Sequence, residues 1–147
     1  MSFTFFGVKG SCSLATHIAL EEAGADYVFK KVDTAAGEQR RPEYLKINPK
    51  GRVPALATPD GVLTENVALL HYVGVTHPRA NLLPMSAFDL AKMNAFNSYL
   101  SSTVHVNHAH KMRGSRWSDD AAVIENLKIK VPQTTTAAAM QAWQAQQ

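Results

Sequence analysis

The only cysteine of the chain, Cys12, lies where a helix is expected to begin. It belongs to the segment GSCSLATHIALEEAG of residues 10–24. Apolar residues recur on neighbouring helical faces from Ser11 onward, Ser11 or Ser13 can cap the start, and Gly24 suits the position after the end. A free cysteine is often a buried and inert small residue, whereas the N-terminus of a helix stabilises a thiolate. The segment alone leaves both interpretations of Cys12 open.

A second group of residues that could do chemistry lies in VHVNHAHKMRGSR, residues 104–116. His105 and His108 are three positions apart and share one helical face. A metal site would need a third ligand at a fixed spacing, and His110 does not supply one, so we expect no metal there. Solvated or interface histidines are the alternative. Three cations accompany the histidines: Lys111, Arg113 and Arg116. They fit a solvated helix end, and no nucleic-acid-binding module accompanies them.

The composition is that of an ordinary globular protein. The chain has 147 residues, 46% of them hydrophobic and 18% charged, with a net charge of +3. These values argue against a disordered chain and against a dedicated nucleic-acid-binding protein. One cysteine excludes a disulfide framework and a CxxC pair. Because the N-terminus lacks a leader pattern and no apolar run could span a bilayer, we expect a cytoplasmic protein without membrane association.

The elements that would position Cys12 begin with a strand, a helix and a second strand. Residues 3–8 and 27–33 have the aromatic and β-branched pattern of strands, on either side of the helix that starts at the cysteine. A connection of this length implies a right-handed crossover and parallel pairing of the two strands. A polar loop over 34–41 and a short helix over 42–47 should follow.

Two further strands and a helix complete the first domain. Residues 52–58 and 61–64 flank Pro59-Asp60-Gly61, which is a hairpin signal. Pro54 lies within the first of these strands, where a proline requires an edge, a bulge or a cis bond. A helix over 67–75 follows Glu65 and Asn66, so the predicted order is β-α-β-α-β-β-α.

The rest of the chain is predicted to be helical. We expect domain boundaries at 1–76, a linker at 77–87 with two prolines, and a helical domain at 88–147. One helix should cover 88–112 and stop at Gly114. Another should begin near Ser118-Asp119-Asp120 and end at Pro132, leaving an Ala/Gln/Thr-rich tail that frays.

This order of elements, together with INPKGRVPAL and DGVLTEN, resembles the N-terminal thioredoxin-like domain of glutathione transferases. The resemblance continues through NLLP to about residue 131, and GSCSLATHIAL is most similar to the bacterial beta class, which has a cysteine at this position. The fold it implies is an α/β thioredoxin-like N-terminal domain followed by a partial all-α C-terminal domain.

The resemblance also implies a glutathione site. Val53, before a cis Pro54, would pair its backbone with the cysteinyl part of glutathione, and Glu65 at a helix start would take the ammonium group. Asn66 stands where the family usually has serine, and Arg52 where glutamine is common. The implied glutathione-binding residues are Cys12, Arg52, Val53, Pro54, Glu65 and Asn66.

Two residues are implied to be catalytic, Cys12 and His105. Cys12 would contact the glutathione sulfur and could form a mixed disulfide with it, although a hydroxyl of Ser11 or Ser13 could serve the sulfur instead. His105 matches a histidine that the beta class places near its active site, but the next position, commonly lysine there, is Val106.

The implied function is conjugation of the glutathione thiolate to small electrophilic hydrophobic compounds, in a detoxifying homodimer with glutathione as co-substrate and no metal. Family members normally continue through several more helices, and this chain is expected to end inside the second of them. The alternative is therefore a glutathione-binding or interaction module with little or no transferase activity.

Overall fold

The computed structural model describes residues 2–144. The chain divides into two compact units, Met1–Leu90 and Ala91–Gln147, and each is described by itself. The expected boundaries at residues 76, 77–87 and 88 stay predictions.

A four-stranded sheet forms the centre of the first unit. Its order is β2-β1-β3-β4, with β1 at Phe3–Gly7, β2 at Tyr27–Lys31, β3 at Ala55–Thr58 and β4 at Gly61–Thr64. β1 and β2 are parallel, as predicted from the long connection, while β1 pairs antiparallel with β3 and β3 with β4. The predicted hairpin is confirmed, since Thr58 and Gly61 are paired at its end. β3 is shorter than predicted because it begins after Pro54, which has no N–H for a ladder.

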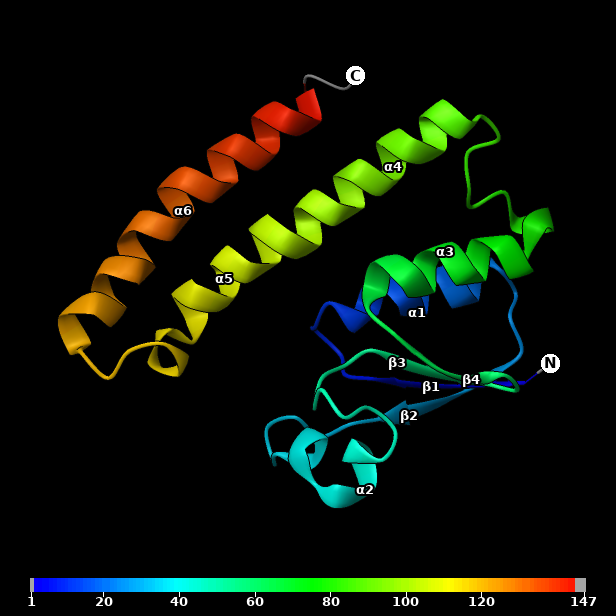
Figure 1. The fold of residues 1–147 in the computed structure, drawn as a ribbon, viewed down its shortest axis with the longest axis horizontal. Helices are drawn as coiled ribbons and strands as arrows, with labels where there is room; N and C mark the ends of the chain where they lie inside the picture. The colour runs from blue at the N-terminus through cyan, green and yellow to red at the C-terminus, as the bar shows by residue number, and fades with distance from the viewer. Residues whose placement is uncertain (1, 145–147) are drawn as a thin grey trace. The chain divides into compact units, whose positions relative to one another are not determined.

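Two helices cover one side of this sheet. α1 spans Ser13–Glu22 and α3 spans Asn66–Thr76, and Figure 1 shows them together on the same side, with α2 (Pro42–Leu45) on the other. A short 3₁₀ turn, η1 at Glu38–Arg40, precedes α2. Between the sheet and the two helices lies the hydrophobic core, which consists of Phe3, Phe5, Ala19, Leu20, Leu56, Leu69 and Val73.

The face of α1 that packs on the core carries only one of the three large apolar residues of this helix. Thr16 and Leu20 are fully buried, whereas Leu14 and Ile18 are 49% and 52% exposed. Gly24 adopts φ +59 just beyond the helix, and the Ala25 N–H reaches back to the Leu20 carbonyl at 3.0 Å, which is the glycine-assisted stop that the sequence predicts.

The segment after α3 packs against its own unit. It contains a 3₁₀ turn, η2 at Pro78–Ala80, and Leu82 lies against the hydrophobic core. Leu83 contacts α3 at Gly74, where an added Cβ would lie 2.5 Å from the Leu83 Cγ. These two leucines explain why the first compact unit extends past the end of α3.

The second unit is helical, as predicted. α4 spans Ala87–Tyr99, a π-helical segment η3 spans Leu100–Val104, and α5 spans His105–Met112. The sequence predicted one uninterrupted α-helix here. The π segment is rich in hydroxyls, and one of them, on Ser101, bonds to the Ser98 carbonyl at 3.0 Å, a contact that competes with regular helical bonding.

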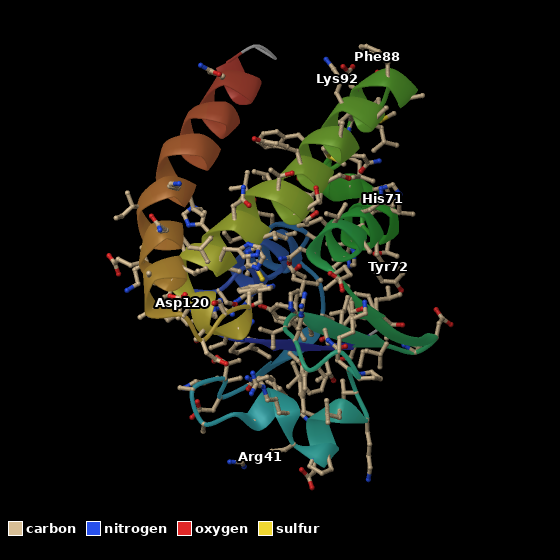
Figure 2. The ribbon with its side chains drawn as sticks, turned by 60° about the vertical axis from the view of Figure 1, so that its left-hand side comes forward. Arg41, His71, Tyr72, Phe88, Lys92 and Asp120 are labelled. Atoms are coloured by element: carbon tan, nitrogen blue, oxygen red, sulfur yellow. The ribbon has the colours of Figure 1, made fainter. Side chains whose placement is uncertain are left out.

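The last helix starts where the sequence predicts and continues further. A 3₁₀ turn, η4 at Gly114–Arg116, leads to α6 at Ala121–Gln144, and Asp120, labelled in Figure 2, caps it by accepting the Ala122 N–H at 2.8 Å. The predicted stop at Pro132 is wrong, because α6 passes through this residue. The alanines and glutamines that follow are strong helix formers. Of the tail expected to fray, residues 145–147 lie outside the described residues.

Among the described helices, none combines the length and the apolar character needed to cross a membrane.

Candidate functional site

Cys12 lies at the N-terminal boundary of α1 and faces the loop that precedes β3. The residue is half-buried, and its Sγ donates to the Val53 carbonyl oxygen at 3.7 Å. The N–H groups at the start of a helix favour negative charge, so a thiolate at this position would be stabilised. Cys12 is not the fully buried residue of the apolar interpretation, and its chemical role stays a prediction.

The neighbouring serines are engaged in holding the turn between β1 and α1. Ser13 is only 2% exposed, and its Oγ bonds to both the N–H and the carbonyl of Val8 at 3.0 Å. Ser11 Oγ donates to the same carbonyl at 2.9 Å and lies 2.7 Å from the Ser13 hydroxyl. These bonds hold the turn at Val8, and the N-cap position of α1 is Cys12, which makes no side-chain cap bond, so they do not show the capping expected of Ser11 or Ser13. Whether a serine hydroxyl could serve the glutathione sulfur stays a prediction.

Val53 is joined to Pro54 by a cis peptide bond, one of the options that the sequence left open. The Val53 carbonyl faces Cys12, and the Val53 N–H has no acceptor within residues 2–144. A backbone donor and acceptor on the same residue, next to a thiol, can pair with an extended peptide-like ligand.

Two buried residues that the sequence analysis missed hold this loop in place. The Tyr44 hydroxyl and the Asn48 Nδ2 each donate to the Arg52 carbonyl at 2.7 Å, and the Asn48 Oδ1 accepts the Lys50 N–H at 3.1 Å. Burial raises the pKa of Tyr44 to about 12; the hydrogen bond with Asn48 opposes the shift and the charge of Glu38 adds to it. The Asn-Pro pair before the glycine was the available signal for Asn48, whereas nothing marked Tyr44.

Glu65 precedes α3 in an unusual backbone conformation. Its φ and ψ are 73° and 120°, values that cost energy for a residue with a side chain and that often occur at functional sites. Its carboxylate accepts a hydrogen bond from Lys50 Nζ at 2.7 Å, and the same ammonium donates to Thr64 Oγ1 at 3.0 Å. Both partners of this ion pair are more than half exposed, so solvent and ligands reach it. Lys50 was not among the predicted site residues.

The side chain of Asn66 points into the protein. Its Oδ1 accepts the Thr16 hydroxyl at 2.7 Å, and its Nδ2 donates to the Cys12 carbonyl at 2.8 Å. The bridge joins the first turns of α1 and α3. With the contact between Cys12 and Val53, it brings the expected binding residues of three segments together.

The remaining predicted residues are Arg52 and His105. Arg52 has an exposed side chain, while its carbonyl is held by the bonds described above. His105 belongs to the second unit, is the first residue of α5 and is exposed. Its expected catalytic role stays a prediction. Within the part of the chain that the structure describes, no three His, Cys, Asp or Glu side chains could hold a metal ion.

Comparisons with known proteins show the family and the fold of the chain. Residues 1–74 match the N-terminal domain of glutathione S-transferases. A solved glutathione transferase homologue from Sulfitobacter, with bound glutathione, is 47% identical with a TM-score of 0.87, covering 94% of this chain and 67% of its own. The chain is also similar to two curated proteins. Glutathione S-transferase GstA of Escherichia coli O157:H7 is 37% identical over 68% of this chain and 51% of its own, and a zeta-class glutathione S-transferase of Euphorbia esula is 42% identical over 52% and 34%.

The fold and these matches define a thioredoxin-like domain followed by helices. The chain belongs to the glutathione S-transferase family. The similarities do not single out the bacterial beta class, because a zeta-class enzyme is among them. The chain spans about half the length, or less, of the two curated relatives named above.

Proposed function

We propose that this protein binds glutathione beside Cys12 and transfers its thiolate to small electrophilic hydrophobic compounds. The observation that carries the proposal is the position of Cys12, at a helix N-terminus with its Sγ 3.7 Å from the carbonyl of the residue before Pro54. The 47% identical Sulfitobacter homologue, which has bound glutathione, supports the same ligand here.

Each part of glutathione has a matching group in the first unit. The backbone of Val53 would pair with the cysteinyl residue as a short added strand. The γ-glutamyl ammonium would take the place of Lys50 on the Glu65 carboxylate, and the γ-glutamyl carboxylate would lie at the N-terminus of α3. Lys50 and Arg52 are exposed cations next to this position and suit a ligand that carries two carboxylates.

The chemistry follows from these positions. The helix N-terminus and the Cys12 thiol would stabilise the glutathione thiolate, which attacks an electrophilic carbon and forms a thioether as the leaving group departs with the bonding electrons. With oxidised glutathione, the Cys12 thiolate would attack the disulfide, giving a mixed disulfide and releasing one glutathione thiolate. The catalytic role expected of His105 belongs to the same proposal and rests on the likeness to the beta-class histidine.

Several finer points belong to the same proposal. The beta-class likeness rests on the cysteine in GSCSLATHIAL, and homodimer formation and a role in detoxification rest on the family. A reducing compartment such as the cytoplasm suits a chain whose only cysteine must stay reduced to act.

The test combines calorimetry with glutathione and a conjugation assay with a generic aryl halide. We expect saturable binding and turnover by the wild type. Cys12→Ala should lower kcat by about tenfold or more, and Glu65→Gln should weaken glutathione binding by about tenfold or more because the ammonium loses its charged partner. Glu125→Gln, which breaks a similarly exposed ion pair with Lys128 on α6, is the matched control.

The outcomes separate the two functions. Binding without turnover would overturn the transferase proposal and leave a glutathione-binding module. The absence of both would overturn the proposal as a whole. An unchanged mass after treatment of the native protein with oxidised glutathione would contradict the mixed disulfide on Cys12.

A further inference from the structure

We propose that Asn66 is a positioning residue for Cys12, acting from α3 on the first turn of α1, rather than a direct contact of the ligand. The inference rests on the proposed function, because it assigns Asn66 a part in preparing the Cys12 thiol. The family's usual serine offers one hydroxyl oxygen at this position, whereas the Asn66 carboxamide offers a separate acceptor and a separate donor atom to its two partners.

The hydrogen bonds of Asn66 determine how its carboxamide is oriented. The Cys12 carbonyl can only accept, so the atom 2.8 Å from it must be the amide nitrogen. The amide oxygen then faces the Thr16 hydroxyl at 2.7 Å and accepts its proton. Both ends of the carboxamide are therefore used within the protein.

The bridge is anchored in the core at one end and reaches the site at the other. Thr16 is fully buried, one helical turn after Cys12. Asn66 itself is the first residue of α3 and follows Glu65, whose backbone is strained. One side chain thus fixes the start of α1 relative to the start of α3.

This arrangement acts on the thiol through the backbone of Cys12. Holding the Cys12 carbonyl keeps the residue at the helix boundary, where its Sγ meets the Val53 carbonyl and the helix N-terminus favours the thiolate. Loss of the bridge removes the bond that ties the Cys12 carbonyl to α3, while the bond from the Ala15 N–H to the same carbonyl at 3.3 Å stays within α1. The thiolate would then be less stabilised.

The experiment measures the rate of Cys12 alkylation by iodoacetamide as a function of pH, by intact mass, in the full chain without glutathione. In Asn66→Ala and Asn66→Ser, we expect the pH midpoint to rise and the rate near neutral pH to fall by about threefold or more. Thr16→Val, which keeps the shape of the side chain, should move the profile in the same direction. Thr16→Ser keeps the hydroxyl and should have the pH profile of the wild type.

The controls isolate the bridge. Asn126→Ala, on the exposed surface of α6, should leave the profile unchanged. The segments around the site carry the charged residues Lys9, Lys50, Arg52 and Glu65. These residues are the same in every variant, so they do not account for a difference between the pH profiles. Thermal unfolding shows which variants are folded.

Two results would overturn the inference. One is a wild-type alkylation profile in a folded Asn66→Ala protein, or in Thr16→Val where Asn66→Ala does not fold. The other comes from kinetics with glutathione: we expect a lower kcat with glutathione affinity changed less than about twofold, so a loss of affinity at unchanged kcat would make Asn66 a ligand contact. Because alkylation needs no glutathione, failure of the wild type to bind glutathione overturns the proposed function and leaves this test intact.

Discussion

At the scale of single residues, the site divides between groups that face a ligand and groups that hold them. Cys12 is half-buried and Glu65 is exposed, and both face the ligand in our proposal, whereas Tyr44 and Asn48 are buried and hold the Arg52 carbonyl. The second kind is hard to find in a sequence, because a tyrosine in a short helix looks like any core residue.

Tyr44→Phe should change how stability depends on pH. The folded pKa of Tyr44, about 12, lies above the ordinary value of 10.0, so its contribution is present below pH 10 and is lost as pH rises toward 12. Wild-type stability should therefore fall by about 2 to 3 kcal/mol over that window from this residue. Tyr44→Phe should lose about 1 kcal/mol at neutral pH, from the missing hydrogen bond, and decline less at high pH.

Urea unfolding between pH 7 and pH 11.5 measures both effects. Tyr99→Phe is the control, because the Tyr99 hydroxyl makes no hydrogen bond within residues 2–144. Parallel decline of Tyr44→Phe and the wild type at high pH would show that Tyr44 is not the cause.

At the scale of elements, local patterns predicted the order of strands and helices, and long-range contacts decided the rest. The crossover, the hairpin and the Gly24 stop follow from residues close in sequence. The apolar spacing of α1 does not show which of its residues are buried: Leu14 and Ile18 are exposed, because the buried face is decided by packing on α3 and the sheet. For the same reason, no local signal links Thr16 to Asn66, 50 positions apart.

The helical region shows the same limit in another form. Proline predicts a helix end because it removes one backbone donor, but α6 continues through Pro132. Of the residue types that follow, alanine and glutamine favour helix whereas threonine does not. The π segment before α5 contains a hydroxyl bond, from Ser101 to the Ser98 carbonyl, that apolar spacing does not reveal.

Gly74→Ala tests how the segment that follows α3, and that contains Leu83, packs on this helix. In an open helix this change stabilises by about 1 kcal/mol, but here the new Cβ would lie 2.5 Å from the Leu83 Cγ. We expect a net destabilisation of about 1 to 3 kcal/mol in urea unfolding. The double variant Gly74→Ala/Leu83→Ala should be more stable than the sum of the single effects predicts. Stabilisation by Gly74→Ala alone would show that Leu83 yields without cost.

At the scale of the whole molecule, the two units differ in how much they bury. Among the residues whose burial the structure describes, the large apolar side chains that are fully buried lie in the first unit: Phe5, Leu20, Leu56, Leu69, Val32 and Val73. Neither α4 nor α5 contains a buried residue, and over residues 91–131 only Gly114 is buried. Since apolar burial is the main favourable term in folding, the first unit should hold most of the stability of the isolated chain.

Hydrogen exchange followed by mass spectrometry tests this difference. Amides of β1, β3, α1 and α3 should exchange at least about tenfold more slowly than those of α5 and α6, because the second unit opens at a lower free-energy cost. The measurement is repeated over a range of protein concentrations, since a partner copy that covers α5 and α6 would protect them by mass action. Protection of α5 and α6 that increases with protein concentration would indicate the proposed homodimer. Equal protection of both units at the lowest concentration would contradict the assignment of stability to the first unit.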